Sequence, residues 1–223
     1  MFADKAEARH FLTESQELRT GNLRMGAVGP FHAIEMLVAF HDRHPGIGIS
    51  VSVGNSKTVL QDLLEFRTDV AVLAYAGSDP RLWVSQYGKD PIVAFARKDH
   101  PLFGPGRSGL SISELHGEAM VVRETESNTR RATEVAMAEA DVRPRIVMEI
   151  GSREAVREVV ARGVGFGVVS KAEHVCDPRT FWLPFLDAEI FNYAHIVCLQ
   201  DRRTSRMTSA FIDAAGEIDT ASA

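Results

Sequence analysis

The sequence is poor in cysteine and has no excess of positive charge. Its 223 residues include two cysteines, Cys176 and Cys198, which form no metal-binding or redox motif. We expect free thiols in a reducing cytoplasm, and a single disulfide is the alternative. The formal net charge of −5 leaves the chain without the basic surface that nucleic-acid phosphates attract. The chain by itself is therefore not expected to bind DNA.

Long apolar runs and catalytic motifs are missing as well. No run approaches the length of a membrane span, and residues 1–9 lack the apolar core of a secretory signal. We therefore expect no membrane partner and a cytoplasmic location. The eight histidines show no metal-ligand spacing, so neither a metal nor another cofactor is expected. With no G-x-S-x-G elbow and no Ser/His/Asp set, the sequence indicates binding chemistry and not an enzyme.

The chain does contain one pattern of strands and helices that occurs twice. Apolar positions with a period of two predict the strands, and those with a helical period predict the helices. The first half is predicted to form strand 23–27, helix 31–44, strand 48–53, helix 56–67 and strand 70–74. The second half is predicted to form strand 119–122, helix 129–140, strand 146–150, helix 153–162 and strand 166–170. This alternation favours a right-handed α/β arrangement in each half.

Further segments complete the pattern. Apolar residues predict strands at 91–97 and 194–199 and a last helix at about 205–218. The segment 98–109 is dense in Pro and Gly and is the predicted boundary between the halves. Residues 1–20 are polar and helix-favouring, which indicates a linker or the end of a longer helix. Helix 31–44 is predicted to be amphipathic, with one face shared by Ile34, Leu37, Val38 and His41.

Polar residues gather at three turns where a predicted strand leads into a helix. These turns are residues 54–58, 124–130 and 151–153. An Asn or Ser side chain in each can cap the helix, and a Lys or Arg stands in its first turn. The helix dipole disfavours a cation there, so a bound anion would offset a real cost. Arginine can also hold a carboxylate or phosphonate with two parallel hydrogen bonds. Plain helix capping without a ligand is the alternative at each turn.

These three turns, and a fourth after the first strand, supply the candidate ligand contacts. In the fourth turn Pro30 suits the start of a helix, and His32 could reach a ligand. The full set of candidates is Gly29, Pro30, Phe31, His32, Asn55, Ser56, Lys57, Thr125, Ser127, Asn128, Thr129, Arg130, Ser152 and Arg153.

Several short segments, in this order and spacing, resemble the effector-binding domain of LysR-type transcriptional regulators. The resemblance covers about residues 20–218. The segments are 21–27 (GNLRMGA), 40–46 (FHDRHPG), 54–56 (GNS), 69–73 (DVAVL), 98–102 (KDHPL) and 161–170 (ARGVGFGVVS).

The resemblance implies an α/β fold like that of a type 2 periplasmic binding protein, with two α/β subdomains joined by two crossover strands. The expected organisation is a linker-helix remnant at 1–20, subdomain I at 21–96 plus 200–223, and subdomain II at 97–199. A small anionic effector would lie between the subdomains of a homodimer or homotetramer. DNA would be contacted only through an N-terminal helix-turn-helix, which is absent from this chain.

By family position the effector pocket maps onto candidates in all four turns. The family often has a Ser or Thr just after the first strand, where this chain has Gly29, Pro30 and Phe31. Segments 79–82 (DPRL) and 149–158 (EIGSREAVRE), together with Arg123-Glu124 and Thr129-Arg130, resemble the branch associated with aminoethylphosphonate catabolism. That likeness suggests 2-aminoethylphosphonate as the effector, although carboxylates would use the same turns. The alternatives are a solute-binding protein of a transporter and an enzyme built on the same two-lobed architecture.

Overall fold

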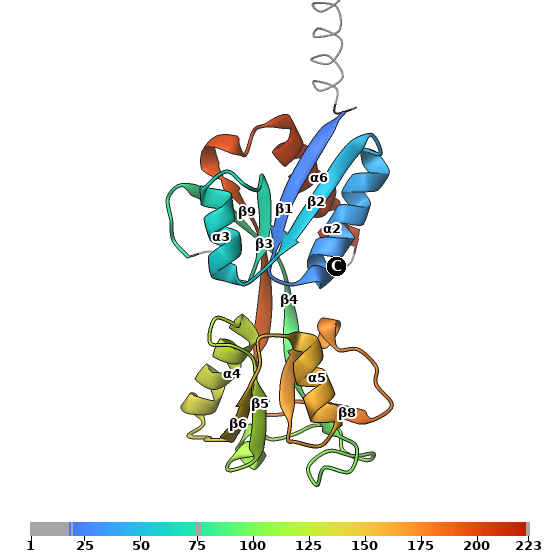
Figure 1. Cartoon of the computed structure of the whole chain (residues 1–223), viewed down its shortest axis with the longest axis vertical. Coiled ribbons are helices and arrows are strands. Elements are labelled where there is room, and N and C mark those ends of the chain that lie inside the picture. The colour runs from blue at the N-terminus through green and yellow to red at the C-terminus, as the bar shows by residue number, and fades with distance from the viewer. Residues whose placement is uncertain (1–17, 19, 75–76, 222–223) are drawn as a thin grey trace, which may run out of the picture. The chain divides into compact units, whose positions relative to one another are not determined.

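The computed structural model describes residues 18, 20–74 and 77–221, without the side chains of Pro30, His32 and residues 218–221 (Figure 1). The predicted linker helix at 1–20 therefore lies outside the described residues, apart from Leu18 and Thr20. The chain divides into two compact units. Unit 1 consists of Met1–Gly88 and Tyr193–Ala223, and unit 2 consists of Lys89–Asn192.

The sheet of unit 1 is built on three parallel strands. β1 (Gly21–Ala27) lies between β2 (Ile47–Val53) and β3 (Val70–Leu73) and pairs with both in parallel. β9 (Phe191–Leu199) adds an antiparallel strand beside β3, with Ala71 opposite Val197. Because β1 and β2 are parallel, their carboxyl ends meet at the same edge of this sheet.

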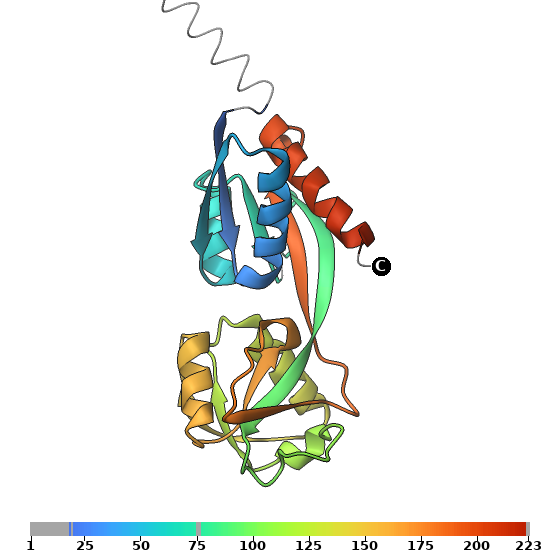
Figure 2. The ribbon, with the colours of Figure 1, turned by 90° about the vertical axis from the view of Figure 1, so that its right-hand side faces the viewer.

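Helices cover both faces of the unit 1 sheet. α2 (Pro30–Arg43) and α6 (Arg206–Ala221) pack together over the face that holds Val70 and Val72 (Figure 2). α3 (Ser56–Leu64) packs over the opposite face, against Ala71 and Leu73. Successive residues of β3 thus serve two cores, as strand geometry requires, which explains why Val70–Leu73 is apolar throughout.

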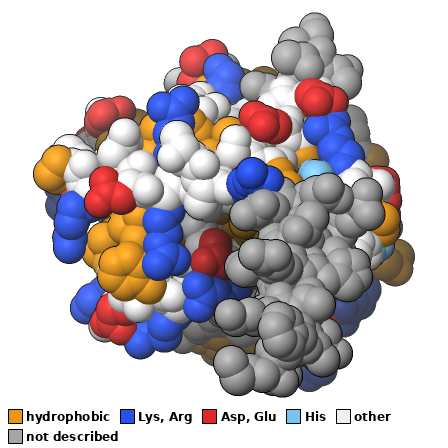
Figure 3. Space-filling view, turned by 90° about the horizontal axis from the view of Figure 1, so that it is seen from above, with side chains coloured by type: hydrophobic (Ala, Val, Ile, Leu, Met, Phe, Trp, Pro, Cys, Tyr) orange, Lys and Arg blue, Asp and Glu red, His pale blue; other side chains and the backbone are white. Residues whose placement is uncertain are grey.

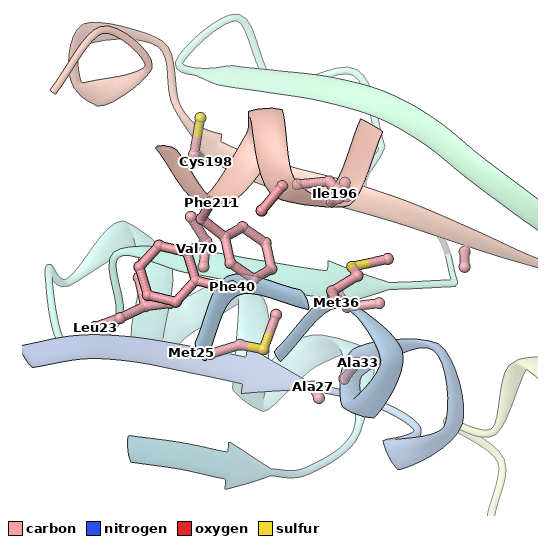
Figure 4. Close-up of a cluster of buried hydrophobic side chains, with 14 of the residues drawn as sticks. Leu23, Met25, Ala27, Ala33, Met36, Phe40, Val70, Ile196, Cys198 and Phe211 are labelled. Carbon is pink, nitrogen blue, oxygen red and sulfur yellow. The ribbon is translucent and has the colours of Figure 1, made fainter. Parts of the chain in front are cut away.

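The larger core of unit 1 is centred on two phenylalanines. Phe40 of α2 and Phe211 of α6 are fully buried, with ring centroids 5.9 Å apart (Figure 4). Burying side chains of this size stabilises a fold by roughly 1.5–3 kcal/mol each. The predicted apolar face of this helix was wrong, because Ile34 and Val38 are each 54% exposed while Met36 and Phe40 face the core.

Unit 2 repeats the arrangement on a second set of strands and two helices. β5 (Ala119–Val122) and β6 (Arg145–Glu149) are parallel, with a register shift after Met120. β4 (Leu82–Arg97) pairs antiparallel with β7 (Gly167–Ser170) and with β8 (Thr180–Pro184).

Two helices cover opposite sides of these strands. α4 (Asn128–Glu139) contributes Met137 to a core with Met120 and Val122 of β5. α5 (Arg153–Ala161) contributes Val156 and Val160 to a smaller core on the other side, with Val121. Alternate residues of β5 therefore again face two cores.

Short helical turns complete the chain at Ile112–Leu115 (η1), Lys171–Glu173 (η2) and Gln200–Arg202 (η3). The chain passes between the units within β4 and β9, whereas the sequence-based boundaries lay at the carboxyl ends of these two strands. The first sequence-based boundary was placed at the Pro- and Gly-rich segment after Arg97, but this segment lies wholly inside unit 2.

Most predicted elements are present with bounds close to those expected, and the fold class is confirmed. β8 and the first part of β4 were not predicted. α3 ends at Leu64 and does not continue to Arg67. The reason is local, because Phe66 takes a left-handed conformation with φ 61°, which an α-helix cannot contain.

Candidate functional site

The predicted polar turns all stand where a strand gives way to a helix. Asn55 follows β2 and precedes α3, Ser127 follows β5 and precedes α4, and Ser152 follows β6 and precedes α5. β5 and β6 are parallel neighbours, so the last two turns lie at the same edge of the unit 2 sheet. That edge is where ligands bind in open α/β sheets.

Each of the three polar side chains caps its helix. Asn55 Oδ1 accepts a hydrogen bond from the Thr58 backbone N–H at 2.9 Å. Ser127 Oγ accepts from the Arg130 N–H at 3.4 Å, and Ser152 Oγ accepts from the Ala155 N–H at 3.3 Å. The capping role, which the sequence offered as an alternative to ligand binding, is thus present at all three turns.

The first-turn arginines already have carboxylate partners. Arg130 donates from Nε to Glu134 and from Nη1 to Glu149, each at 2.7 Å, and its side chain is only 11% exposed. The hydrogen bonds to Glu134 and Glu149 raise the pKa of Arg130 above its usual value, against the effect of burial. Arg153 Nε lies 3.1 Å from Glu173 Oε2. The protein itself therefore offsets the cost of a cation at these two helix starts.

The candidates in unit 1 lie at the starts of α2 and α3. Gly29 is the N-cap of α2 and makes no side-chain cap, and Phe31 is 39% exposed. The side chains of Pro30 and His32 are outside what the structure describes. Ser56 is the first residue of α3, and Lys57 beside it is exposed.

The other candidates of unit 2 have local partners. Thr125 Oγ1 donates to Glu126 Oε2 at 3.0 Å. Asn128 Oδ1 accepts from Arg131 Nη2 at 2.7 Å. Both interactions involve exposed side chains beside the start of α4.

A pocket within unit 2 brings two of the predicted residues together with four polar residues that the sequence did not suggest as contacts. Its apolar lining, which we call the floor, consists of Phe95, Val156, Val168, Val169 and Val175. Its polar lining consists of Arg123, Thr129, Arg153, Arg157, Glu173 and His174. A concave apolar surface with a few convergent polar groups is typical of a small-molecule site.

The cations of this pocket are not all neutralised. Arg123 makes a two-pronged ion pair with Glu124, with both contacts at 2.8 Å. Arg153 pairs with Glu173. Among the described residues, Arg157 has neither a hydrogen bond nor a carboxylate at ion-pair distance. Within the described residues, Glu154 and Asp177 act on this charge only from beyond ion-pair distance, so the pocket can accept an anion here.

His174 adds a neutral polar group to the pocket. Its ring centroid lies 6.1 Å from that of Phe95 and 6.1 Å from that of Trp182. Burial lowers the pKa of His174 and the charge of Arg157 lowers it further, while Asp177 opposes both effects. The lowered pKa favours the neutral imidazole, which has one hydrogen-bond donor and one acceptor.

Thr129 is the candidate most firmly held at this site. It is 8% exposed, and its hydroxyl accepts a hydrogen bond from Asn192 Nδ2 at 2.9 Å. Its backbone carbonyl accepts from the Thr133 hydroxyl at 2.8 Å. Thr129 is therefore fixed in a single position at the pocket wall.

The missed residues differ in how far the sequence could have revealed them. Arg157 stands four positions after Arg153, which places both on one face of α5. That spacing was a usable signal. Glu173 and His174 lie in and just after η2, where no periodicity relates them to the polar turns.

The described residues include neither a metal-binding cluster nor a membrane-spanning helix. Within the part of the chain that the structure describes, no group of three or more His, Cys, Asp or Glu side chains could hold a metal ion. In the same ranges, no helix is both long enough and apolar enough to cross a membrane. The described part of the face in Figure 3 carries Lys and Arg interspersed with Asp and Glu.

Comparisons with known proteins relate this chain to a family. Residues 16–218 match the family model described as "LysR substrate binding domain". The HTH-type transcriptional activator CmpR of Synechocystis is 27% identical over 212 residues, which are 93% of this chain and 69% of that protein. The RuBisCO operon transcriptional regulator of Allochromatium vinosum is 29% identical over 206 residues, which are 92% of this chain and 68% of that protein.

Solved structures of regulatory domains share the fold of this chain. The Synechocystis CcmR regulatory domain, in complex with 2-PG, has a TM-score of 0.79 at 25% identity, covering 90% of this chain and 98% of that one. The effector-binding domain of QuiR, in complex with shikimate, has a TM-score of 0.81 at 19% identity, covering 91% of this chain and 98% of that one, and it supports the fold alone. The relatives named here are transcriptional regulators, which gives no support to the transporter or enzyme alternatives.

Proposed function

The chain belongs to the LysR substrate-binding domain family, and from that premise we propose that it senses a small anionic metabolite for a transcriptional regulator. The observation that carries this proposal is the pocket of unit 2, with its apolar lining and the charge of Arg157, which no described carboxylate meets at ion-pair distance. The Synechocystis regulatory domain that was solved with 2-PG supports it, because that protein shares the fold and binds a ligand.

The anionic group is proposed to bind the cationic wall of the unit 2 pocket. Arg157 contributes a guanidinium charge that no described carboxylate meets at ion-pair distance. Thr129 and Arg153 lie at the N-terminal ends of α4 and α5. Asn55 and Ser56 of unit 1 are proposed as further effector contacts. 2-Aminoethylphosphonate is our first candidate effector, with small carboxylates as the competing class.

Signalling is proposed to follow from a shift between conformations. An effector can move an equilibrium only through its different affinity for the two states. A bound effector would favour one conformation of the chain, whose two units are joined through β4 and β9. The DNA-binding domain that receives the signal is proposed to lie outside this chain, in the cytoplasm with its operator.

We propose a second copy of the chain as the partner that transmits this change. Ile34 and Val38, one turn apart on α2, are each 54% exposed. Ile146 and Met148 of β6 are 51% and 39% exposed. An exposed apolar pair on one helix face, such as Ile34 and Val38, is proposed as part of an interface. Replacing Ile34 with Glu should convert a dimer to a monomer in sedimentation, and an unchanged assembly would remove this face from the interface.

A thermal-shift screen tests the sensing function. The purified chain would be heated with 2-aminoethylphosphonate, phosphate, sulfate and a panel of small carboxylates. A ligand that binds only the folded state stabilises it by about 2.7 kcal/mol at a hundredfold excess over its dissociation constant. A selective rise in midpoint with one anion supports the proposal. If no anion shifts the midpoint, the polar turns are helix caps alone and the proposal fails.

A further inference from the structure

One acidic side chain in the unit 2 pocket has an unmet hydrogen-bonding requirement. Glu173 lies at the end of η2, and its side chain is only 14% exposed. Its Oε2 atom is buried and accepts no hydrogen bond from the described residues. Arg153 Nε is 3.1 Å away, so the two charges attract, but the N–H does not point at this oxygen well enough to form a hydrogen bond.

A buried carboxylate oxygen without a donor is costly in a folded protein. Leaving such a group unsatisfied loses the hydrogen bonds that water would have given it. Groups of this kind are therefore expected to have a partner that completes them. Because Glu173 lines the pocket, a bound molecule can bring that partner.

The pocket thus presents two different demands to one ligand. Arg157 has a positive charge without a carboxylate at ion-pair distance among the described residues, and it calls for an anionic group. Glu173 has an oxygen without a donor and calls for an N–H or O–H group. A simple carboxylate meets only the first demand, because it has no N–H or O–H group to donate.

We propose that Glu173 selects anions that also carry a protonated amine, so that the anionic group lies against Arg157 and the ammonium donates to Glu173 Oε2. This rests on the proposed function, because it defines the class of ligand for that same site. The apolar floor, which includes Val156 and Val168, would contact the short carbon chain between the two polar ends. Glu173 is in this account a specificity-determining residue.

The test uses two pairs of ligands that differ only at the amine. β-Alanine is compared with butyrate, and 2-aminoethylphosphonate is compared with propylphosphonate, because a methyl group replaces the ammonium in each pair. Dissociation constants would be measured by calorimetry on the whole chain. In at least one pair, the amine-bearing member should bind about tenfold or more tightly, the factor expected of one charge-assisted hydrogen bond.

A Glu173→Gln variant should abolish that preference. The amide is nearly the same size but has no charge, so it neither attracts an ammonium nor repels a simple anion. Butyrate and propylphosphonate should therefore bind this variant more tightly than they bind the original chain. Glu139→Gln is the matched control, because Glu139 ends α4, is exposed and does not line the pocket. It should leave both ratios unchanged.

The outcomes separate this inference from the broader one. Equal binding within both pairs, tighter binding of the methyl-bearing members, or an unchanged ratio in Glu173→Gln overturns the role of Glu173. Failure of both amine-bearing probes to bind also overturns it. The sensing function fails only if no anion of the wider screen binds. Thermal unfolding of each variant shows whether it is folded, and Glu173→Asp, which keeps the charge, should retain part of the preference.

Discussion

Replacing Arg157 with Gln should weaken anion binding by one to two orders of magnitude. Arg157 is the pocket arginine without a carboxylate at ion-pair distance among the described residues, so an anion can approach its guanidinium without displacing an ion pair. A hydrogen bond to a charged group contributes about 1.5–3 kcal/mol, which corresponds to roughly 10- to 150-fold in the dissociation constant. The fold should tolerate the change, because Arg157 is only partly buried and no ion pair is lost.

Calorimetry with the anion that gives the largest thermal shift would measure this effect. Arg143→Gln is the matched control, since Arg143 belongs to the same unit but its side chain is 82% exposed and lies outside the pocket. A loss of affinity in both variants would indicate a general effect of net charge. Unchanged affinity in Arg157→Gln alone would refute the placement of the anion at this arginine.

The same variant gives a second and independent reading. The charge of Arg157 contributes to the lowered pKa of His174, after the larger effect of burial. Removing that charge should raise the pKa of His174, which can be followed by NMR of the imidazole protons. A pKa that does not move would show that the two side chains are not close enough to interact.

Other predictions concern stability and reactivity. Phe40→Ala removes a fully buried ring from the core of unit 1 and should lower the free energy of unfolding by about 3–5 kcal/mol in urea titrations; a loss below 1 kcal/mol would contradict that packing. Burial lowers the pKa values of His100 and His174, so on acidification the unfolded state takes up protons before the folded state does. The stability that comes from this difference is complete above about pH 6.5 and is lost as the pH falls. The loss is at most about 1.4 kcal/mol per pH unit for each histidine. A stability profile that rises on acidification from pH 7 to 5.5 would be incompatible with this. Burial also raises the pKa of Cys198 to about 11, whereas Cys176 is exposed, so a thiol reagent at pH 8 should modify Cys176 at once and Cys198 only after unfolding; rapid reaction of both would argue against it.

Periodicity in the sequence was enough to predict most strands and helices, but not which side of a helix faces the core. Between Ile34 and Phe40, apolar residues occur around most of α2, so helical spacing alone could not single out one face. The choice was made by tertiary packing, since Met36 and Phe40 face Phe211 of α6, which is far away in the sequence. β8 was missed because Thr180–Pro184 is short and stands between irregular segments.

The candidate site shows the same limit. The polar turns could be located because strand ends and helix caps have local signals, and Thr129 and Arg153 do line the unit 2 pocket. Arg130 looked equivalent to Arg153 in the sequence, and both have carboxylate partners, but of the two only Arg153 lines the pocket. Glu149 lies in β6, outside the helix that holds Arg130, so only the three-dimensional arrangement distinguishes the two arginines. Glu173 joins the pocket from η2, through a long-range contact that no local pattern announces.

The most direct test of the account is a crystal structure of the chain with the anion that the thermal screen selects. The account predicts density for the anionic group within hydrogen-bond distance of the Arg157 guanidinium, at the pocket wall that Thr129 and Arg153 form. A ligand bound elsewhere on the chain, with this pocket left to solvent, would contradict it.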